Sequence, residues 1–575
     1  MGWKAEYDRW LNHEALNKEM SEELEQAKQN ESLLEDCFHK NLEFGTAGMR
    51  GELGAGTNRL NVYTIRKAAE GLARFIEKQG DDAKQRGVVI AYDSRHKSSE
   101  FAMEAALTIG AHGIKVYVFE ELRPTPELSF AVRYLHTFSG IVITASHNPP
   151  EYNGFKVYGK DGGQLPPEQA DELINYVNGV DNELTIETAK KEAIQENGML
   201  QMISEEVDAA YMNHLQSIII QPNLVYEVGK DLKIVFSPLH GAANFPVQRS
   251  LEAAGFQQVT VVQEQEQPDP NFTTVKSPNP EDVAAFELAM SYGEAIHADL
   301  LIATDPDGDR VGVSVRNHDG EFIVLTGNQT GALLIEYLLS QKQMKGVLPQ
   351  NGVILKSIVT SELGRQIADA YGVTTIDVLT GFKFIAEKMR QFEETKEFSF
   401  QMGYEESYGY LIRDFARDKD AVQAVLLISE VAAYYKEQGK TLYDGLLNIY
   451  EKYGYYREGQ VSLSFKGIEG TKKIESIMNS FRQDIPSSIA ETTIIKMADY
   501  NEGVYIDLMN QHKEETLLPK SNVLKFFLED GSWFCIRPSG TEPKIKFYFD
   551  VNGLSMEDSE RKFNKMKDFI MQRVG

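Results

Sequence analysis

The amino-acid sequence predicts an α/β protein with several domains and largely parallel sheets. A strand, a polar loop, a helix, a glycine and a second strand follow one another three times along the chain. These units begin at three apolar strands, residues 88–91, 234–236 and 353–355. Because apolar strands that alternate with helices are typical of βαβ units, we expect three similar mixed α/β domains.

A glycine separates the helix from the second strand in each unit. The three glycines are Gly113, Gly255 and Gly372. A glycine after the last helical turn adopts the left-handed conformation easily and allows the last carbonyl groups of the helix to be hydrogen-bonded. The strands expected after these glycines span residues 115–119, 259–262 and 374–378.

The C-terminal part of the chain predicts a smaller α+β domain. Its expected strands span residues 504–508, 523–528, 533–536 and 544–551, before a closing helix at 555–574. Asp530 and Gly531 form a dipeptide that is typical of a hairpin turn. A chain of 575 residues is long enough for three or four domains of about 100–200 residues. We place four domains at 1–205, 206–325, 326–455 and 456–575.

The net charge is −27, because 86 acidic residues outnumber 59 basic ones. This balance argues against a uniformly basic nucleic-acid-binding protein. It does not argue against a small anionic substrate, because exposed charges are screened beyond about 10 Å.

Two cysteines, Cys37 and Cys535, lie far apart in the sequence, so neither a disulfide framework nor a metal-binding spacing is expected. A reducing compartment is the natural interpretation. The N-terminus has no apolar signal region, and no run of about 18 apolar residues predicts a membrane span. We therefore expect the cytoplasm and no membrane partner.

The loop 144–149, Thr-Ala-Ser-His-Asn-Pro, follows the apolar run 141–143. Open parallel sheets place their ligand sites at the carboxyl ends of strands, so Ser146 is a candidate nucleophile. The alternative is an ordinary turn. An acyl-transfer serine is disfavoured, because a nucleophile elbow has flanking glycines and the nearest neighbours here are Ala145 and His147.

A second polar loop carries three aspartates at alternate positions, Asp305, Asp307 and Asp309. Their oxygens suit a hard cation such as magnesium or calcium. An EF-hand is excluded, because Arg310 and Arg316 stand where that motif has glycine and glutamate. The alternative is an acidic surface turn, which the apolar strands on both sides of the loop disfavour.

Two further loops have residues that suit a sugar phosphate. Residues 537–543, Arg-Pro-Ser-Gly-Thr-Glu-Pro, offer a guanidinium, hydroxyls and a glycine backbone, which together suit a phosphate dianion. Residues 403–407, Gly-Tyr-Glu-Glu-Ser, offer carboxylates that can accept hydrogen bonds from sugar hydroxyls. A plain loop and a solvent-facing glutamate pair are the respective alternatives.

With these four loops in this order, the chain resembles the α-D-phosphohexomutase superfamily and its phosphoglucomutase/phosphomannomutase family. The resemblance begins at residues 44–51, Phe-Gly-Thr-Ala-Gly-Met-Arg-Gly, and continues at 92–95, Tyr-Asp-Ser-Arg. It implies a four-domain, heart-shaped fold with three similar mixed α/β domains and a C-terminal α+β domain.

The resemblance also implies a phosphoserine at Ser146 and one Mg²⁺ per chain, held by that phosphoserine with Asp305, Asp307 and Asp309. Phosphate would pass from Ser146 to a glucose monophosphate and return from a glucose 1,6-bisphosphate intermediate. The residues expected to contact the sugar or its non-reacting phosphate are Glu405, Glu406, Ser407, Arg537, Ser539, Gly540 and Thr541.

Further residues are expected to support phosphoryl transfer. Arg50, Arg95 and Arg310 would stabilise the phosphoryl oxygens, and Gly381, Lys383 and Lys419 would contact the substrate. For proton transfer we expect Lys156, with a pKa lowered by burial near other cations. His147 is the alternative, and either residue would otherwise serve only to neutralise phosphate.

The sugar preference is left open by one departure from the family pattern. Tyr404 stands where glucose-preferring relatives have a glycine before Glu-Glu-Ser. Mutases for mannose, glucosamine or pentose phosphates are therefore alternatives. A metal-dependent sugar phosphatase is a rival of another class, and a non-catalytic sugar-phosphate sensor is a third.

Overall fold

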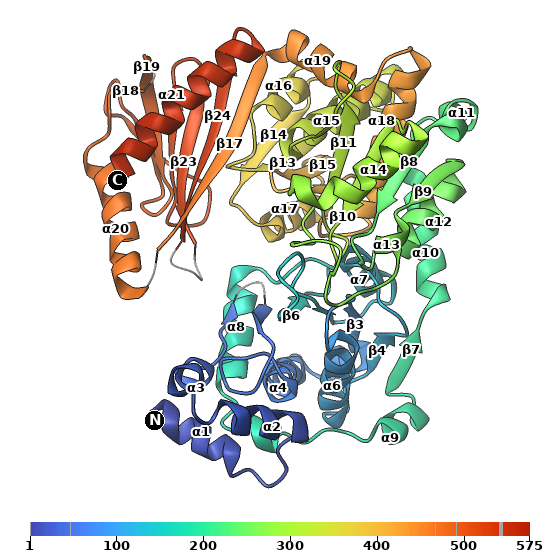
Figure 1. Ribbon diagram of the computed structural model, residues 1–575, viewed down its shortest axis with the longest axis vertical. Coiled ribbons are helices and arrows are strands. Elements are labelled where there is room, and N and C mark those ends of the chain that lie inside the picture. The colour runs from blue at the N-terminus through green and yellow to red at the C-terminus, as the bar shows by residue number, and fades with distance from the viewer. Residues whose placement is uncertain (1, 46–47, 466, 490, 540–543, 575) are drawn as a thin grey trace. The chain divides into compact units, whose positions relative to one another are not determined.

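A computed structural model describes residues 2–45, 48–465, 467–489, 491–539 and 544–574 (Figure 1). The chain forms two compact units. The first comprises residues 1–327, 382–403 and 407–442, and the second comprises 328–381, 404–406 and 443–575.

Three short helices open the first unit. They are α1 (Trp3–Leu11), α2 (Lys18–Ala27) and α3 (Glu31–Phe38). Asn17 and Asn30 cap α2 and α3 by accepting backbone hydrogen bonds. Trp10 is fully buried among the apolar side chains of these helices, and its Nε1 donates to Glu183 at 2.8 Å.

A seven-stranded sheet follows, with the order β1-β2-β6-β5-β3-β4-β7. Its strands are β1 (Phe44–Gly45), β2 (Gly48–Glu52), β3 (Val88–Tyr92), β4 (Val116–Phe119), β5 (Ser139–Ile143), β6 (Tyr152–Tyr158) and β7 (Leu200–Ile203). Strands β5, β3, β4 and β7 are parallel, whereas β6 is antiparallel to both β5 and β2. The helices are α4 (Val62–Gln79), α5 (Asp81–Arg86), α6 (Ser98–Ala111), α7 (Thr125–Tyr134), α8 (Pro167–Asn178) and α9 (Lys191–Glu196). Apolar side chains of α4, α6 and α8 share one buried cluster with this sheet.

The first unit also contains a five-stranded sheet, with the order β12-β11-β10-β8-β9. Its strands are β8 (Lys233–Ser237), β9 (Gln258–Val261), β10 (Leu300–Thr304), β11 (Val311–Arg316) and β12 (Phe322–Val324). Strands β9, β8 and β10 are parallel, and β11 returns antiparallel to β10. The accompanying helices are α10 (Glu205–Leu215), α11 (Pro222–Glu227), α12 (Asn244–Ala254), α13 (Gln263–Glu266) and α14 (Glu287–Ile296).

The middle of the chain continues the α/β pattern. Its elements are α15 (Gly327–Met344), β13 (Gly352–Ser357), α16 (Leu363–Ala370), β14 (Thr374–Val378), α17 (Phe382–Thr395), β15 (Ser399–Glu405), β16 (Gly409–Leu411), α18 (Ala421–Glu437) and α19 (Leu442–Tyr453). Within the second unit, β13 and β14 pair in parallel.

The C-terminal sheet is antiparallel, with the order β17-β24-β23-β22-β19-β20-β21 and β18 paired to β19. Its strands are β17 (Tyr455–Ser464), β18 (Ser488–Ile489), β19 (Thr492–Asp499), β20 (Val504–Asp507), β21 (Lys513–Glu515), β22 (Leu524–Leu528), β23 (Trp533–Pro538) and β24 (Lys544–Gly553). Helices α20 (Gly467–Gln483) and α21 (Met556–Val574) share a buried apolar cluster with the sheet.

The fold class predicted from the sequence is confirmed. Each of the three glycines expected at a helix end has a positive φ, which is 67° at Gly113, 109° at Gly255 and 69° at Gly372. The predicted hairpin joins β22 and β23, with Gly531 at a φ of 84°. Among the described residues, no helix is both long and apolar enough to cross a membrane.

Asp550 is a buried carboxylate on β24 within the second unit. Its Oδ2 accepts the backbone amide of Glu362 at 2.9 Å, and its Oδ1 is buried with no hydrogen-bond partner among the described residues. Burial raises the pKa of Asp550 to about 7. The folded chain therefore keeps a proton that the unfolded chain releases near pH 3.9.

We expect Asp550 to make the second unit less stable as the pH rises from about 4 to about 7, because the folded state binds its proton more tightly than the unfolded state. Asp550→Asn keeps an acceptor for the Glu362 amide and removes this dependence. By linkage the variant should gain about 4 kcal/mol over the wild type near pH 8 and less than half of that near pH 5. Thermal unfolding at both pH values measures the difference, and an equal gain at both would contradict the prediction.

Candidate active site

The candidate nucleophile Ser146 follows β5 in a strained turn of the first unit. Its φ is 54°, which lies in the left-handed region that non-glycine residues seldom adopt. Its backbone N–H donates to Thr144 Oγ1 at 2.7 Å, and the residue is buried. Strain of this kind costs about 1–2 kcal/mol and is concentrated at functional sites.

The structure places Ser146 in contact with residues 305–309, which we call the acidic loop, although 159 positions separate Ser146 from Asp305. We call residues 144–152, which carry Ser146, the serine loop. The hydroxyl of Ser146 donates to Asp305 Oδ2 at 2.8 Å, and His147 Nδ1 lies 3.1 Å from the same hydroxyl. The serine loop and the acidic loop therefore form one site.

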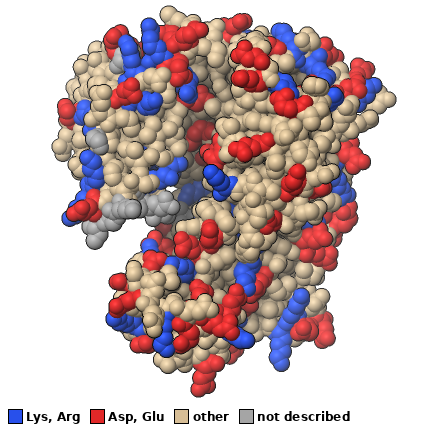
Figure 2. Space-filling view, in the orientation of Figure 1, with Lys and Arg blue, Asp and Glu red and all other residues tan. Residues whose placement is uncertain are grey.

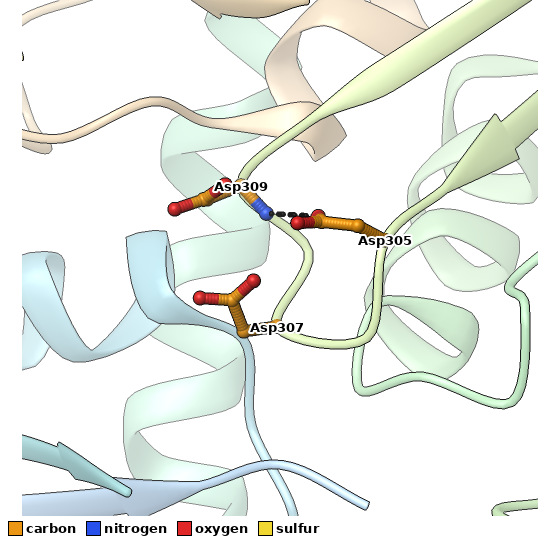
Figure 3. A group of neighbouring side chains, drawn as sticks. All are labelled: Asp305, Asp307 and Asp309. Atoms are coloured by element: carbon orange, nitrogen blue, oxygen red, sulfur yellow. Dashed lines mark hydrogen bonds between the residues drawn. The ribbon is translucent and has the colours of Figure 1, made fainter. Parts of the chain in front are cut away.

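The three aspartates lie on the tight turn between β10 and β11 (Figure 3). Asp305 Oδ1 accepts the backbone amides of Asp309 at 3.0 Å and Arg310 at 2.9 Å, and Gly308 takes a φ of 64° within the turn. All three side chains are buried. The acidic loop is therefore a buried turn stabilised by its own hydrogen bonds, and not an acidic surface turn.

The acidic loop can hold a metal ion. One oxygen from each of Asp305, Asp307 and Asp309 lies within 4.8 Å of the others. The second oxygens Asp307 Oδ1 and Asp309 Oδ1 are buried and have no hydrogen-bond partner among the described residues. Burial, and then the charges of the other two aspartates, raise the pKa of Asp305 well above its usual range. A bound cation would relieve this repulsion, so the donor set fits a hard divalent ion.

Two buried lysines contact the acidic loop. Lys156 Nζ, from β6, lies 2.6 Å from Asp307 Oδ2 and 3.4 Å from Asp309 Oδ2. Lys419 Nζ lies 3.0 Å from Asp309 Oδ2. The expected lowering of the Lys156 pKa is wrong: burial acts to lower it, but the charges of Asp307 and Asp309 prevail and the pKa of Lys156 is raised.

The environment of His147 keeps its imidazole neutral. Burial, followed by the positive charges of Arg310 and Arg50, holds the pKa of His147 well below its usual range. A neutral imidazole can accept a proton, so its position beside the Ser146 hydroxyl suits either a proton acceptor or an orienting residue.

The three predicted arginines of the first unit differ in exposure. Arg50 is exposed and donates to Asn148 Oδ1 at 2.7 Å. Arg310 is partly buried, forms an ion pair with Glu281 and lies 3.8 Å from Asp309 Oδ1. Arg95 is buried, and its guanidinium donates to backbone carbonyl oxygens of the serine loop.

Sequence reasoning missed Thr125, at the start of α7. Its Oγ1 donates to Asp307 Oδ2 at 2.9 Å, and its backbone N–H donates to the Asp307 carbonyl at 2.8 Å. Thr125 follows β4, which pairs in parallel with β3. Its position at the start of the helix that follows a parallel strand was the available signal.

We expect Thr125→Val to weaken divalent-cation binding about 10-fold, because a residue that orients a metal ligand typically contributes 10–100-fold in affinity. Calorimetric titration with Mg²⁺ or Mn²⁺ measures the change. Thr125→Ser keeps the hydroxyl and is the matched control. Equal affinity in the valine and serine variants would refute an orienting role.

The predicted sugar-binding glutamates are held in place within the second unit. Glu405 is buried, and its Oε1 accepts the backbone amide of Gly381 at 2.7 Å. Glu406 Oε2 accepts hydrogen bonds from Ser357 at 3.0 Å and Thr360 at 3.1 Å. These contacts make the pair an ordered feature rather than a solvent-facing one.

Tyr404, the departure from the family pattern, packs inside the second unit. It is fully buried, and a Cβ atom added at Gly331 of α15 or Gly364 of α16 would lie 2.7 Å or 2.1 Å from it. The ring thus occupies space that two glycines leave between helices. Because successive side chains of a strand point to opposite faces, Tyr404 and Glu405 face opposite ways.

The other predicted substrate residues lie in both units. In the second unit, Arg537 donates to the Tyr548 hydroxyl at 3.3 Å, and the Ser539 amide donates to the Lys544 carbonyl at 2.7 Å. In the first unit, burial lowers the pKa of Lys383, and Ser407 is partly buried. Gly540 and Thr541 lie outside the described residues.

A loop serine that is hydrogen-bonded to a buried triple-aspartate turn, on βαβ sheets, is an arrangement suited to phosphoryl transfer. Four phosphoglucomutase/phosphomannomutase family models match the chain. They are alpha/beta/alpha domain I at residues 41–184, domain II at 209–320, domain III at 326–453 and the C-terminal domain at 495–555. The chain belongs to this family, which confirms the resemblance seen in the sequence.

Individual relatives agree. The phosphoglucomutase of Staphylococcus haemolyticus is 41% identical over 91% of this chain and 93% of its own. That of Staphylococcus saprophyticus is 38% identical over 96% and 98%. Two solved structures share the fold: parafusin, a phosphoglucomutase from Paramecium, has a TM-score of 0.69 at 17% identity and covers 93% of this chain and 94% of its own. A family protein from Burkholderia thailandensis has a TM-score of 0.63 at 19% identity and covers 92% and 97%.

Proposed function

We propose that this enzyme interconverts α-D-glucose 1-phosphate and glucose 6-phosphate through a phosphoserine at Ser146 and a glucose 1,6-bisphosphate intermediate. The observation that carries the proposal is the 2.8 Å contact between Ser146 Oγ and Asp305 beside two further buried carboxylates. The relatives named as phosphoglucomutases, at 38–41% identity, favour glucose as the sugar.

We propose that Asp305, Asp307 and Asp309, with an oxygen of the phosphorylated Ser146, hold one Mg²⁺ per chain. When bound, this ion supplies positive charge against the transferring phosphoryl group. The protein contributes Lys156 and Lys419, which contact carboxylate oxygens of Asp307 and Asp309. It also contributes Arg310, which lies 3.8 Å from Asp309 Oδ1, and Arg50, which contacts Asn148. These cations favour the phosphoryl group in the transition state.

The proton of the attacking sugar hydroxyl has two candidate acceptors, His147 and Lys156. His147 lies 3.1 Å from the Ser146 hydroxyl, whereas Lys156 is paired with Asp307 at 2.6 Å. Replacing the residue that accepts the proton should lower kcat by about 10²–10⁴-fold with little change in KM. Kinetics of His147→Gln and Lys156→Gln therefore assign the role, and a rise in KM alone would mark a residue that only binds phosphate.

The substrate-binding residues are proposed in two groups. The sugar hydroxyls would meet Glu405, Glu406 and Ser407, with Gly381, Lys383 and Lys419 as further contacts. The non-reacting phosphate would meet Arg537, Ser539, Gly540 and Thr541. The ordering of Glu405 and Glu406 by their neighbours supports the first group, because held acceptors bind with less loss of entropy.

The domain boundaries near residues 205, 325 and 455 remain part of the proposal, and the four family matches support them. We also propose the cytoplasm as the compartment. Cys37 and Cys535 are free and buried, as is usual in reducing surroundings. Figure 2 shows Lys and Arg interspersed with Asp and Glu over one face of the described chain, which agrees with a small-molecule substrate rather than a nucleic acid.

Two measurements test the function. Intact mass of the purified protein, after exposure to glucose 1,6-bisphosphate, should show one phosphate adduct that maps to Ser146. A coupled assay should show glucose 1-phosphate becoming glucose 6-phosphate without free phosphate. Steady phosphate release would identify a sugar phosphatase, and faster turnover of mannose, glucosamine or ribose phosphates would replace glucose as the sugar.

A further inference from the structure

Arg95 Nη1 and Nη2 are fully engaged by the loop that carries Ser146. Nη1 donates to the carbonyl oxygens of Pro149 at 2.7 Å and Tyr152 at 3.0 Å. Nη2 donates to the carbonyl oxygens of Ser146, at 2.6 Å, and of Asn148. Four carbonyl groups within seven residues thus converge on one guanidinium.

The remaining donor of Arg95, its Nε–H, is buried in an ion pair and makes no hydrogen bond to the described residues. Its Nε lies 3.4 Å from Asp93 Oδ2, and both side chains are fully buried. Asp93 is held in turn, since its Oδ1 accepts the Arg95 amide at 3.0 Å and the Ser98 hydroxyl at 2.7 Å. Four of the five N–H donors of the guanidinium are therefore taken by carbonyl oxygens, and the fifth is enclosed beside Asp93, where both side chains are fully buried.

The loop needs such an anchor. Ser146 has a φ of 54°, and this strained conformation persists only if surrounding contacts determine it. Within the loop, the Ser146 amide donates to Thr144 Oγ1, and the amides of Asn148 and Tyr152 donate to the carbonyls of Ala145 and Pro149. Arg95 binds the carbonyls on both sides of this turn.

We infer that Arg95 is a positioning residue that holds the serine loop in its strained conformation, and not a ligand of the substrate phosphate. Asp93 aligns the guanidinium, so residues 92–95 hold the serine loop in position. The exposed Arg50 donates to the Asn148 side chain of the same loop, and its guanidinium remains one that we expect to meet phosphate. The kinetic consequences of this inference rest on the proposed function. The hydrogen bonds between Arg95 and the serine loop do not depend on that function.

Hydrogen exchange of Arg95→Lys tests the anchor directly, without any sugar phosphate. A lysine offers three donors on one atom and cannot span four carbonyls. We expect the amides of residues 146, 148 and 152 to exchange at least ten times faster than in the wild type, while β3 is unchanged. Unchanged exchange in the loop would overturn the inference.

Steady-state kinetics give the second readout. A displaced nucleophile should lower kcat about 10²-fold, because a misplacement near 1 Å has this effect, with KM changed less than threefold. A lost phosphate ligand would instead raise KM with kcat retained, which would overturn the inference. Arg50→Lys is the comparison within the site, with a raised KM and normal loop exchange expected.

Two further variants separate the loss of the Arg95 contacts from a general effect on folding. Arg86→Lys is the matched control, because Arg86 also donates to two backbone carbonyls, those of His136 and Thr137, outside the site; wild-type activity and loop exchange are expected. Asp93→Asn keeps the arginine and should speed exchange of the same amides by a smaller factor. If wild-type protein takes no phosphate on Ser146, the proposed function fails, yet the exchange result still decides the role of Arg95.

Discussion

Ser146→Ala is expected to lower kcat about 10⁴-fold or more, because removing a covalent nucleophile leaves only binding and charge stabilisation. The phosphate adduct in the intact mass should disappear at the same time. Alanine tolerates the left-handed backbone no better than serine does, so the loop conformation stays strained. The variant loses the hydroxyl's hydrogen bond to Asp305, which contributes about 1 kcal/mol of stability.

Ser146→Gly separates strain from chemistry. Glycine adopts a φ of 54° without penalty, so this variant should be about 1 kcal/mol more stable than Ser146→Ala and equally inactive. Ser217→Ala is the matched control, since Ser217 is exposed and its hydroxyl donates to the His214 carbonyl. More than a tenth of wild-type activity in either Ser146 variant would show that another residue carries the phosphate.

Local sequence patterns predicted the βαβ units and the loops that end their strands. The left-handed glycines Gly113, Gly255 and Gly372 were predictable because the steric rule acts on one residue. The clustering of Asp305, Asp307 and Asp309, which could hold a metal ion, was predictable because the three carboxylates lie within five residues along the chain. Both signals are local, and no knowledge of partners distant in the sequence is needed to read them.

Contacts between distant residues were not predictable. The Lys156 pKa is raised because Asp307 and Asp309, more than 150 positions away, lie beside its ammonium group. Likewise, burial of Tyr404 depends on space left by Gly331 and Gly364. For Lys156 the residue type suggested proton transfer, and the fold supplies two carboxylate partners. For Tyr404 the sequence left the sugar preference open, and the fold buries the ring inside the second unit.

The acidic loop should behave as a destabilising feature without a cation and a stabilising one with it. Burial, and then repulsion among the three carboxylates, raise the pKa of Asp305. In wild-type protein treated with a chelator and then given Mg²⁺ at about 100 times its Kd, the folded state should gain about 2.7 kcal/mol. Thermal unfolding with and without Mg²⁺ measures this gain.

Asp305→Asn should separate the two effects. The amide oxygen can still accept the amides of Asp309 and Arg310, so the turn keeps its caps, but one negative charge is removed. We expect a protein that is at least as stable as the wild type after chelation, gains almost nothing from Mg²⁺, and has a kcat/KM lower by about 10³-fold. Asp319→Asn removes the same charge from an exposed turn and should retain wild-type behaviour. If Asp305→Asn instead loses stability in the chelated state and still responds to Mg²⁺, then Asp305 supports the turn rather than the ion, and the metal site must be sought elsewhere.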